Sequence, residues 1–133
     1  MPVTVPPGGH IKGLQTGLAI DGDVNGRCEN VRIAQPTTNF RRTDKTILVV
    51  FTALADGNPN AEAWATLLFD STPPQILYLS LPAIIRCPGT AVYPSALDIS
   101  NIPPGQYSVG IFYSENFLMP PQPEVAIPVT ISP

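Results

Sequence analysis

Residues 97–113 read LDISNIPPGQYSVGIFY, and this stretch decides the fold. Leu97 and Ile99 alternate with polar residues before a Pro-Pro-Gly turn, and apolar residues recur at every second position after it. Alternation with a period of two is typical of a β-strand that buries one face. The stretch therefore predicts two strands joined by a tight corner.

Tyr107 comes just after this corner, and Val109 lies two positions further along the chain. This arrangement resembles the tyrosine corner of immunoglobulin-like sandwiches. The resemblance implies that the Tyr107 hydroxyl bonds to the backbone a few residues upstream and fixes the connection between the two strands. It concerns the fold, and a fold alone does not assign a function.

Turn signals separate further short strands along the chain. The most apolar segment, 46–54 (TILVVFTAL), has no polar alternation, which predicts a central strand buried on both faces. Trp64 is expected in the core. Other strands are predicted at 14–20, 29–33, 63–70, 75–81 and 125–131, whereas 35–45 and 82–94 are predicted to be irregular. The spacing of the 17 prolines would break most helices.

Seven to nine short strands between turns predict an all-β fold, an immunoglobulin-like two-sheet antiparallel sandwich with extended Pro-rich terminal arms. A closed barrel is the alternative that the sequence leaves open. We predict an extended N-terminal arm over residues 1–13 and a single sandwich domain over 14–133, because a chain of 133 residues fits one domain.

The composition is poor in charge. Charged residues make up 13% of the chain, where about 25% is usual, and 44% of residues are hydrophobic. Such a surface predicts that a partner covers part of it. The net charge is −3 and the seven basic residues are scattered, so the basic face that nucleic-acid binding requires is missing. The sequence contains no run of 18 apolar residues, the length that a membrane span needs. The N-terminus lacks the apolar region of a secretory signal, which predicts cytoplasmic synthesis.

The two cysteines, Cys28 and Cys87, lie far apart in the chain. A bridge between them would close a long loop and stabilise the fold, whereas synthesis in a reducing cytosol would leave them as thiols. The sequence leaves both alternatives open. Neither cysteine lies where the bridge between strands B and F of an antibody domain would place it.

Asp21, Asp23 and Asn25, followed by Gly26, copy the first half of an EF-hand loop and form a weak calcium candidate. Arg32 occupies the twelfth position, where an EF-hand has its bidentate glutamate. A hairpin turn requires the same residue types, because Asn, Asp and Gly tolerate a positive φ. We predict the turn, and no metal or other cofactor.

His10, the only histidine, lies in the Gly-flanked arm and is expected to be exposed to solvent. No nucleophile or general base stands in a recognisable catalytic pattern, so the sequence predicts a protein that is not an enzyme.

Apolar residues near both ends of the chain are candidates for contacts with a partner. These partner-binding candidates are Val3, Val5, Phe117, Leu118, Met119, Val125 and Ile127. Exposed apolar clusters tend to mark interfaces. The loop residues 117–119 either dock a partner or fold back to cap the sandwich.

We expect a non-catalytic structural subunit of a larger assembly, which contacts other protein subunits as a homo-oligomer or in a capsid or filament lattice. It is expected to bind neither nucleic acid nor membrane. Immunoglobulin-like domains decorate many tailed-phage heads and tails, and the chain is similar to them in size and style, which implies a location in the virion. One alternative is a secreted filament or pilus-type subunit or a cell-surface adhesin that uses edge-strand addition. Another is a carbohydrate-binding sandwich with an aromatic strip built from Phe112, Tyr113 and Phe117.

Overall fold

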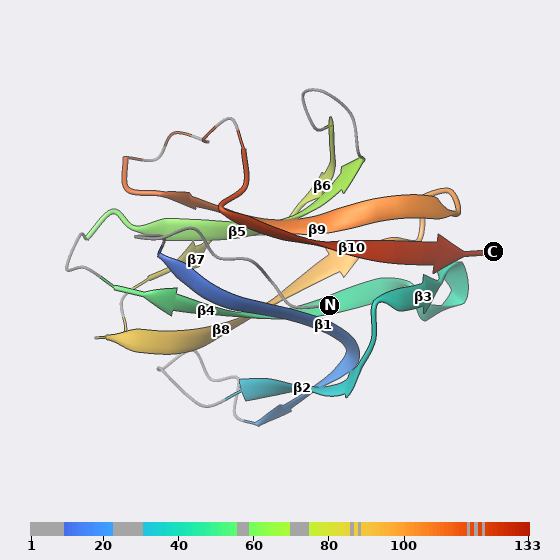
Figure 1. The fold of residues 1–133 in the computed structure, drawn as a ribbon, viewed down its shortest axis with the longest axis horizontal. Coiled ribbons are helices and arrows are strands. Elements are labelled where there is room, and N and C mark those ends of the chain that lie inside the picture. The colour runs from blue at the N-terminus through green and yellow to red at the C-terminus, as the bar shows by residue number, and fades with distance from the viewer. Residues whose placement is uncertain are drawn as a thin grey trace.

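The structure is a computed structural model of the 133-residue chain. It describes residues 10–22, 31–55, 59–69, 75–85, 87, 89–116, 118, 120 and 122–133. Within these residues, ten strands and one short 3-10 helix, η1 (Arg42–Asp44), form two sheets that pack face to face (Figure 1). The predicted all-β sandwich is confirmed, and because each sheet has its own edges, the closed barrel is excluded.

The first sheet has the strand order β2-β1-β4-β8. Its strands are β1 (Ile11–Gly22), β2 (Val31–Pro36), β4 (Thr46–Leu54) and β8 (Thr90–Asp98). The segment predicted as the central strand is β4, and it pairs antiparallel with both β1 and β8. Continuous pairing on both sides is the environment that a strand without polar alternation requires.

The second sheet has the order β3-β10-β9-β5-β6, with β7 also paired to β5. Its strands are β3 (Asn39–Arg41), β5 (Glu62–Phe69), β6 (Gln75–Leu79), β7 (Ala83–Ile84), β9 (Gly105–Ser114) and β10 (Val125–Ser132). All pairs are antiparallel except β3 with β10. The set β1, β4, β8 opposite β10, β9, β5 matches strands A, B, E opposite G, F, C of immunoglobulin-like sandwiches.

The connection from β8 to β9 is the predicted tyrosine corner. The Tyr107 hydroxyl donates a hydrogen bond to the carbonyl oxygen of Pro103 at 2.6 Å. The backbone N–H of Ile99 donates to the Lys45 carbonyl oxygen at 2.9 Å, so the start of the corner is tied to the segment that enters β4. The chain therefore crosses from one sheet to the other at a fixed angle.

A second set of bonds closes the first turn of this corner. The backbone N–H and the hydroxyl of Ser100 both donate to Oδ1 of Asp98, at 2.9 and 2.6 Å. These bonds favour the ionised form and lower the pKa of the Asp98 carboxyl group. This Asx-type turn ends β8 directly after Asp98.

The core lies between the two sheets and is filled by alternate residues of their inner faces. Its largest fully buried side chains are Ile11, Phe40, Ile47, Val49, Phe51, Leu67, Leu97, Ile99, Val109, Ile111, Val129 and Ile131. Leu97 and Val109, which the sequence places on the buried faces of its deciding stretch, are both among them. The Phe51 and Tyr93 rings also stack, with centroids 5.6 Å apart.

The outer face of the first sheet is covered by the chain itself. Val31 and Ile33 of β2 pack on Val50 of β4 in a second, smaller cluster. β1 makes this possible because it pairs with β4 up to Gly17 and with β2 from Gly17 onward. The core-facing side chains of β4 are buried, whereas on its outer face only Val50 is buried and Leu48 and Thr52 stay partly exposed, so the predicted burial of both faces holds only in part.

Three predicted bounds differ from the structure. β1 begins at Ile11, inside the predicted 1–13 arm, because this side chain is fully buried opposite Ala53. The predicted loop 35–45 contains β3 and η1, and the predicted irregular segment 82–94 contains β7 and the start of β8. Pairing along β4 outweighs the presence of Pro94 in β8.

Trp64 is not a core residue, which corrects the prediction. Its neighbours Ala63 and Ala65 point into the core, so Trp64 lies on the outer face of β5, where it is half-buried opposite Phe112. Small alanines face inward because the opposing sheet supplies the larger core residues.

Gly17→Ala is expected to destabilise the fold by about 1–3 kcal/mol through overpacking. An added Cβ would clash with the Ile33 side chain and lie 2.8 Å from the Gln35 carbonyl oxygen. Gly13→Ala in the same strand is the control, because its Cβ would lie at an ordinary 3.7 Å from Thr52 Oγ1. Urea unfolding of both variants tests this, and equal stabilities would contradict the close approach of β2.

Tyr107→Phe is expected to lower the free energy of unfolding by about 1 kcal/mol, because it deletes the bond to Pro103 and retains the ring. Tyr78→Phe, at an exposed position on β6, is the matched control and should leave stability unchanged. If both variants unfold at the same denaturant concentration, the corner bond does not stabilise the sandwich.

Candidate functional site

The predicted partner residues separate into three groups. Leu118 is 68% exposed and is available to a partner. Val125 and Ile127 are only 3% and 6% exposed and belong to the core, so their side chains cannot contact a partner and the prediction is wrong for them. The remaining candidates, Val3, Val5, Phe117 and Met119, lie outside the described residues.

The segment between β9 and β10 folds back onto the second sheet. A Cβ on Gly110 would lie 2.9 Å from both Pro123 Cβ and Leu68 Cδ1, so Pro123 packs directly against the outer face of β9. Of the residues 117–119, for which docking or capping was predicted, Leu118 is exposed and does not cap the sandwich, whereas Pro123, outside that range, packs on it. Phe112 and Tyr113 are both buried and offer no flat, exposed platform for a sugar.

Asp21, the first residue of the calcium candidate, forms an ion pair with Arg32. Asp21 Oδ2 accepts a hydrogen bond from Arg32 Nη2 at 2.6 Å, so the residue in the position of the EF-hand glutamate neutralises the carboxylate instead. Asp23 and Asn25 lie outside the described residues. Among the residues that the structure describes, no group of three or more His, Cys, Asp or Glu side chains is placed to hold a metal ion.

His10 is packed rather than free in solvent, which corrects the expectation from the sequence. Its ring stacks on Tyr113 with centroids 4.1 Å apart and planes 8° from parallel. Nε2 lies 3.7 Å from Glu115 Oε2, and Nδ1 lies 4.0 Å from Glu124 Oε1. The same Glu124 oxygen accepts hydrogen bonds from the backbone N–H groups of His10 and Ile11.

A hollow of about 360 Å³ adjoins this cluster and is lined in part by Ser114 and Asn116. The Ser114 hydroxyl already donates to Asn116 Oδ1 at 2.9 Å, so it is not positioned as a nucleophile for His10. The Glu115 carboxylate lies beside Nε2 of His10, and the Glu124 carboxylate lies beside Nδ1. The two carboxylates therefore cannot bind one metal ion together with the same ring nitrogen. The cluster therefore fixes the start of β1 to β9 and β10, and it carries no catalytic arrangement.

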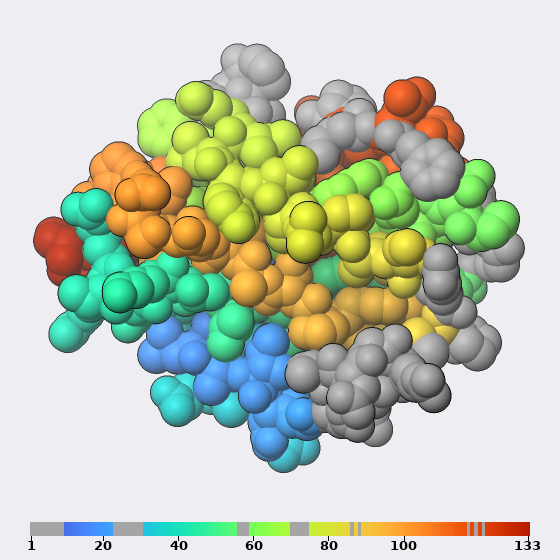
Figure 2. Space-filling model, turned by 180° about the vertical axis from the view of Figure 1, so that it is seen from behind, coloured from blue at the N-terminus to red at the C-terminus, as the bar shows by residue number. Residues whose placement is uncertain are grey.

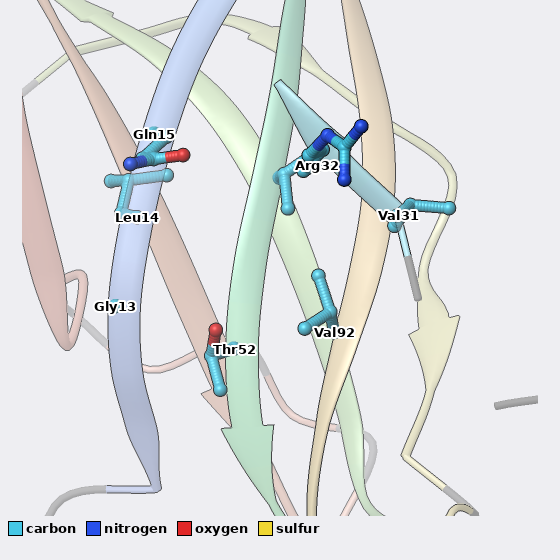
Figure 3. A pocket seen from close by; sticks show the side chains of 8 residues that line it. Gly13, Leu14, Gln15, Val31, Arg32, Thr52 and Val92 are labelled. Carbon is cyan, nitrogen blue, oxygen red and sulfur yellow. The ribbon is translucent and has the colours of Figure 1, made fainter. Parts of the chain in front are cut away.

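A second hollow, of about 450 Å³, lies on the outer face of the first sheet (Figure 3). Thr52 and Val92 line it from the neighbouring strands β4 and β8, while β2 crosses above them with Val31 and Arg32. The Arg32 guanidinium is committed to Asp21. Among the described residues that line this hollow, no acid or base stands against a nucleophile.

Cys87 is buried and disulfide-bonded, so it is not a free thiol. The other cysteine of the chain, Cys28, lies outside the described residues. The backbone N–H of Cys87 donates to the Tyr93 hydroxyl at 3.3 Å. Burial raises the pKa of this hydroxyl, and the bond from Cys87 acts in the opposite direction.

The feature that the sequence analysis missed is an apolar edge on the second sheet. Of the eight large hydrophobic residues that are exposed in the described part of the chain, six lie between residues 69 and 84. We call them the β6 edge patch: Phe69, Ile76, Tyr78, Leu79, Leu81 and Ile84. Leu81 is 89% exposed, and the others are 36–46% exposed.

The patch residues lie on both faces of the edge that β6 and β7 form along β5. Tyr78 pairs with Leu67, whose side chain faces the core, whereas Ile76, Leu79 and Ile84 pair with residues of the outer face of β5. Figure 2 shows the segment that contains β6 and β7, coloured from yellow-green to yellow, as an unbroken surface across the upper half of the molecule in that view. A sequence signal for it exists: QILYLSLPAII, residues 75–85, contains no charged residue. The alternation in this segment predicted one buried and one exposed face. It did not predict that both faces would carry large apolar side chains.

A scan against protein-family models found no matching family, and searches of curated proteins and of solved structures found no match. Within the described residues, the structure contains no helix with the length and apolar character needed to cross a membrane.

Glu124→Ala is expected to accelerate amide hydrogen exchange at Ile11 about tenfold, because a backbone bond to a charged group contributes roughly 1.5–3 kcal/mol. Glu115→Ala is the control: this carboxylate accepts from the Tyr113 hydroxyl, and no described backbone amide donates to it. Similar exchange at Ile11 in the two variants would show that Glu124 does not hold the start of β1.

Proposed function

We propose that the protein is a non-catalytic structural subunit of a larger assembly and that it joins this assembly through the β6 edge patch. The observation that carries the proposal is the concentration of exposed apolar side chains at one edge of the sandwich. Exposed apolar patches beyond a few hundred Å² mark interaction sites in soluble proteins.

The rest of the surface makes this patch unusual for the molecule. The outer face of β4 is covered by Val31 and Ile33, and that of β9 by Pro123. In both places, a segment of the same chain lies over the outer face of a strand. The edge formed by β6 and β7 has no comparable cover among the described residues, and a partner subunit is the cover that we propose.

We further propose the virion surface as the location of this assembly. This proposal rests on the resemblance in fold and size to immunoglobulin-like decoration domains, together with a composition in which only 13% of residues are charged. A fold-level resemblance is an analogy and not a motif match.

The principal alternative mechanism, strand addition to a sheet edge, is hindered at two of the described edges, those of β8 and β6. β8 is open along nine residues, but Pro94 near its centre has no N–H to donate. At β6, Leu67 pairs with Tyr78 and Leu68 with Ile76, so Leu77 is an extra, bulged residue. Both features are devices that protect sheet edges from further strands. Side-chain packing is therefore the mode of contact that we favour.

The experiment compares the wild-type chain with Leu81→Asp in the organism that encodes it. The wild-type protein should sediment in a density gradient with a large particle, whereas Leu81→Asp should remain in the light fractions. Because Leu81 is 89% exposed, the substitution should not disturb folding.

Two further variants locate the contact. Leu18→Asp, an exposed leucine on the other sheet, is the matched control and should sediment like the wild type. Leu118→Asp tests the contact predicted from the sequence. Sedimentation of Leu81→Asp with the particle would overturn the assignment of the β6 edge patch, and a wild-type chain found only in light fractions would overturn the assembly role.

A further inference from the structure

We infer that the partner at the β6 edge patch is a second copy of this chain, related to the first by a two-fold axis beside β6. This inference rests on the proposed function: a second copy covers the patch, and the dimer formed in this way is the unit that enters the assembly. Three observations carry it: the charge of the edge, the state of its backbone ladder and the area it offers.

The first observation is the absence of charge along residues 75–85. In a two-fold contact the same patch meets itself, so any charged residue near the axis would face its own copy and repel it. A strip without Asp, Glu, Lys or Arg avoids this cost entirely. A strongly acidic or basic partner, in contrast, would find no opposite charge on the strip and would lose hydration without compensation.

The second observation is that the backbone of this edge cannot pair with a long added strand. The bulge at Leu77 interrupts the ladder of β6, and Pro82 supplies no N–H before β7 begins. Ser80 directs its N–H inward, to the Ala65 carbonyl oxygen at 2.9 Å. The contact must therefore come from side chains, and a two-fold side-chain contact closes on itself instead of propagating into a fibre.

The third observation is the area. With whole side chains of this size burying roughly 150–200 Å², a copy that contacts both faces of the edge would meet exposed fractions of the six patch residues on the order of 500 Å². Two copies would then bury on the order of 1,000 Å², which is the lower end of specific protein interfaces. The expected product is a weak, reversible dimer whose population rises with concentration.

The experiment is sedimentation velocity of the purified full chain over a wide range of concentration. The weight-average mass of the wild type should rise toward that of a dimer. Leu81→Asp should raise the dissociation constant about tenfold or more, because it places a charge in the apolar contact. Leu18→Asp should dimerise as the wild type does.

A charge-exchange pair tests whether the patch meets its own copy. Leu81→Asp and Leu81→Lys should each remain monomeric, and an equimolar mixture of the two should recover dimers. Circular dichroism and thermal unfolding of each variant establish that it is folded. Recovery in the mixture is expected only if the two Leu81 positions lie in one shared interface.

The possible results separate this inference from the proposed function. A wild-type chain that stays monomeric at every concentration, yet still enters a large particle in a Leu81-dependent manner, overturns the second copy as partner and leaves the assembly role intact. Dimers that are unaffected by Leu81→Asp overturn the inference by placing the interface elsewhere. A monomer that enters no particle overturns both.

Discussion

The position of β4 inside its sheet is the constraint on which the rest of the structure depends. One face of β4 supplies Ile47, Val49 and Phe51 to the core between the sheets, and the other supports Val50 beneath β2. Because the apolar residues of β4 do not alternate with polar ones, this strand lies inside its sheet with β1 and β8 on either side. The departure of β1 from β4 at Gly17 then brings β2 across the outer face.

The outer face of the second sheet is covered by a different kind of segment. Over β9 this face is covered by Pro123 from the segment that connects β9 to β10, and Gly110 provides the space that this contact needs. Both sheets thus use short segments of the chain as an additional layer. Several outer positions of the second sheet are therefore buried, among them Thr66, Leu68 and Phe112.

The His10 cluster and the tyrosine corner each tie one sheet to the other. Glu124, which precedes β10, holds the first residues of β1 through backbone N–H groups, while Tyr107 fixes the passage from β8 to β9. Polar groups near an apolar core are stabilising only when their hydrogen bonds are satisfied, and both sites meet that requirement. The β6 edge patch differs from them because its exposed groups are apolar and carry no such bonds.

The sequence by itself determined the class of fold, the position of β4, and the bond from Tyr107, because period-two alternation, an uninterrupted apolar run and corner chemistry are local signals. The candidate site was not predictable in the same way. Val125 and Ile127 occupy the apolar positions of an alternating strand and face the core instead of a partner, and Trp64 faces outward because Ala63 and Ala65 take the inner positions. The tertiary structure alone decided which apolar residues remain exposed, since that depends on which segments cross each face, and these crossings join residues that are far apart in the chain.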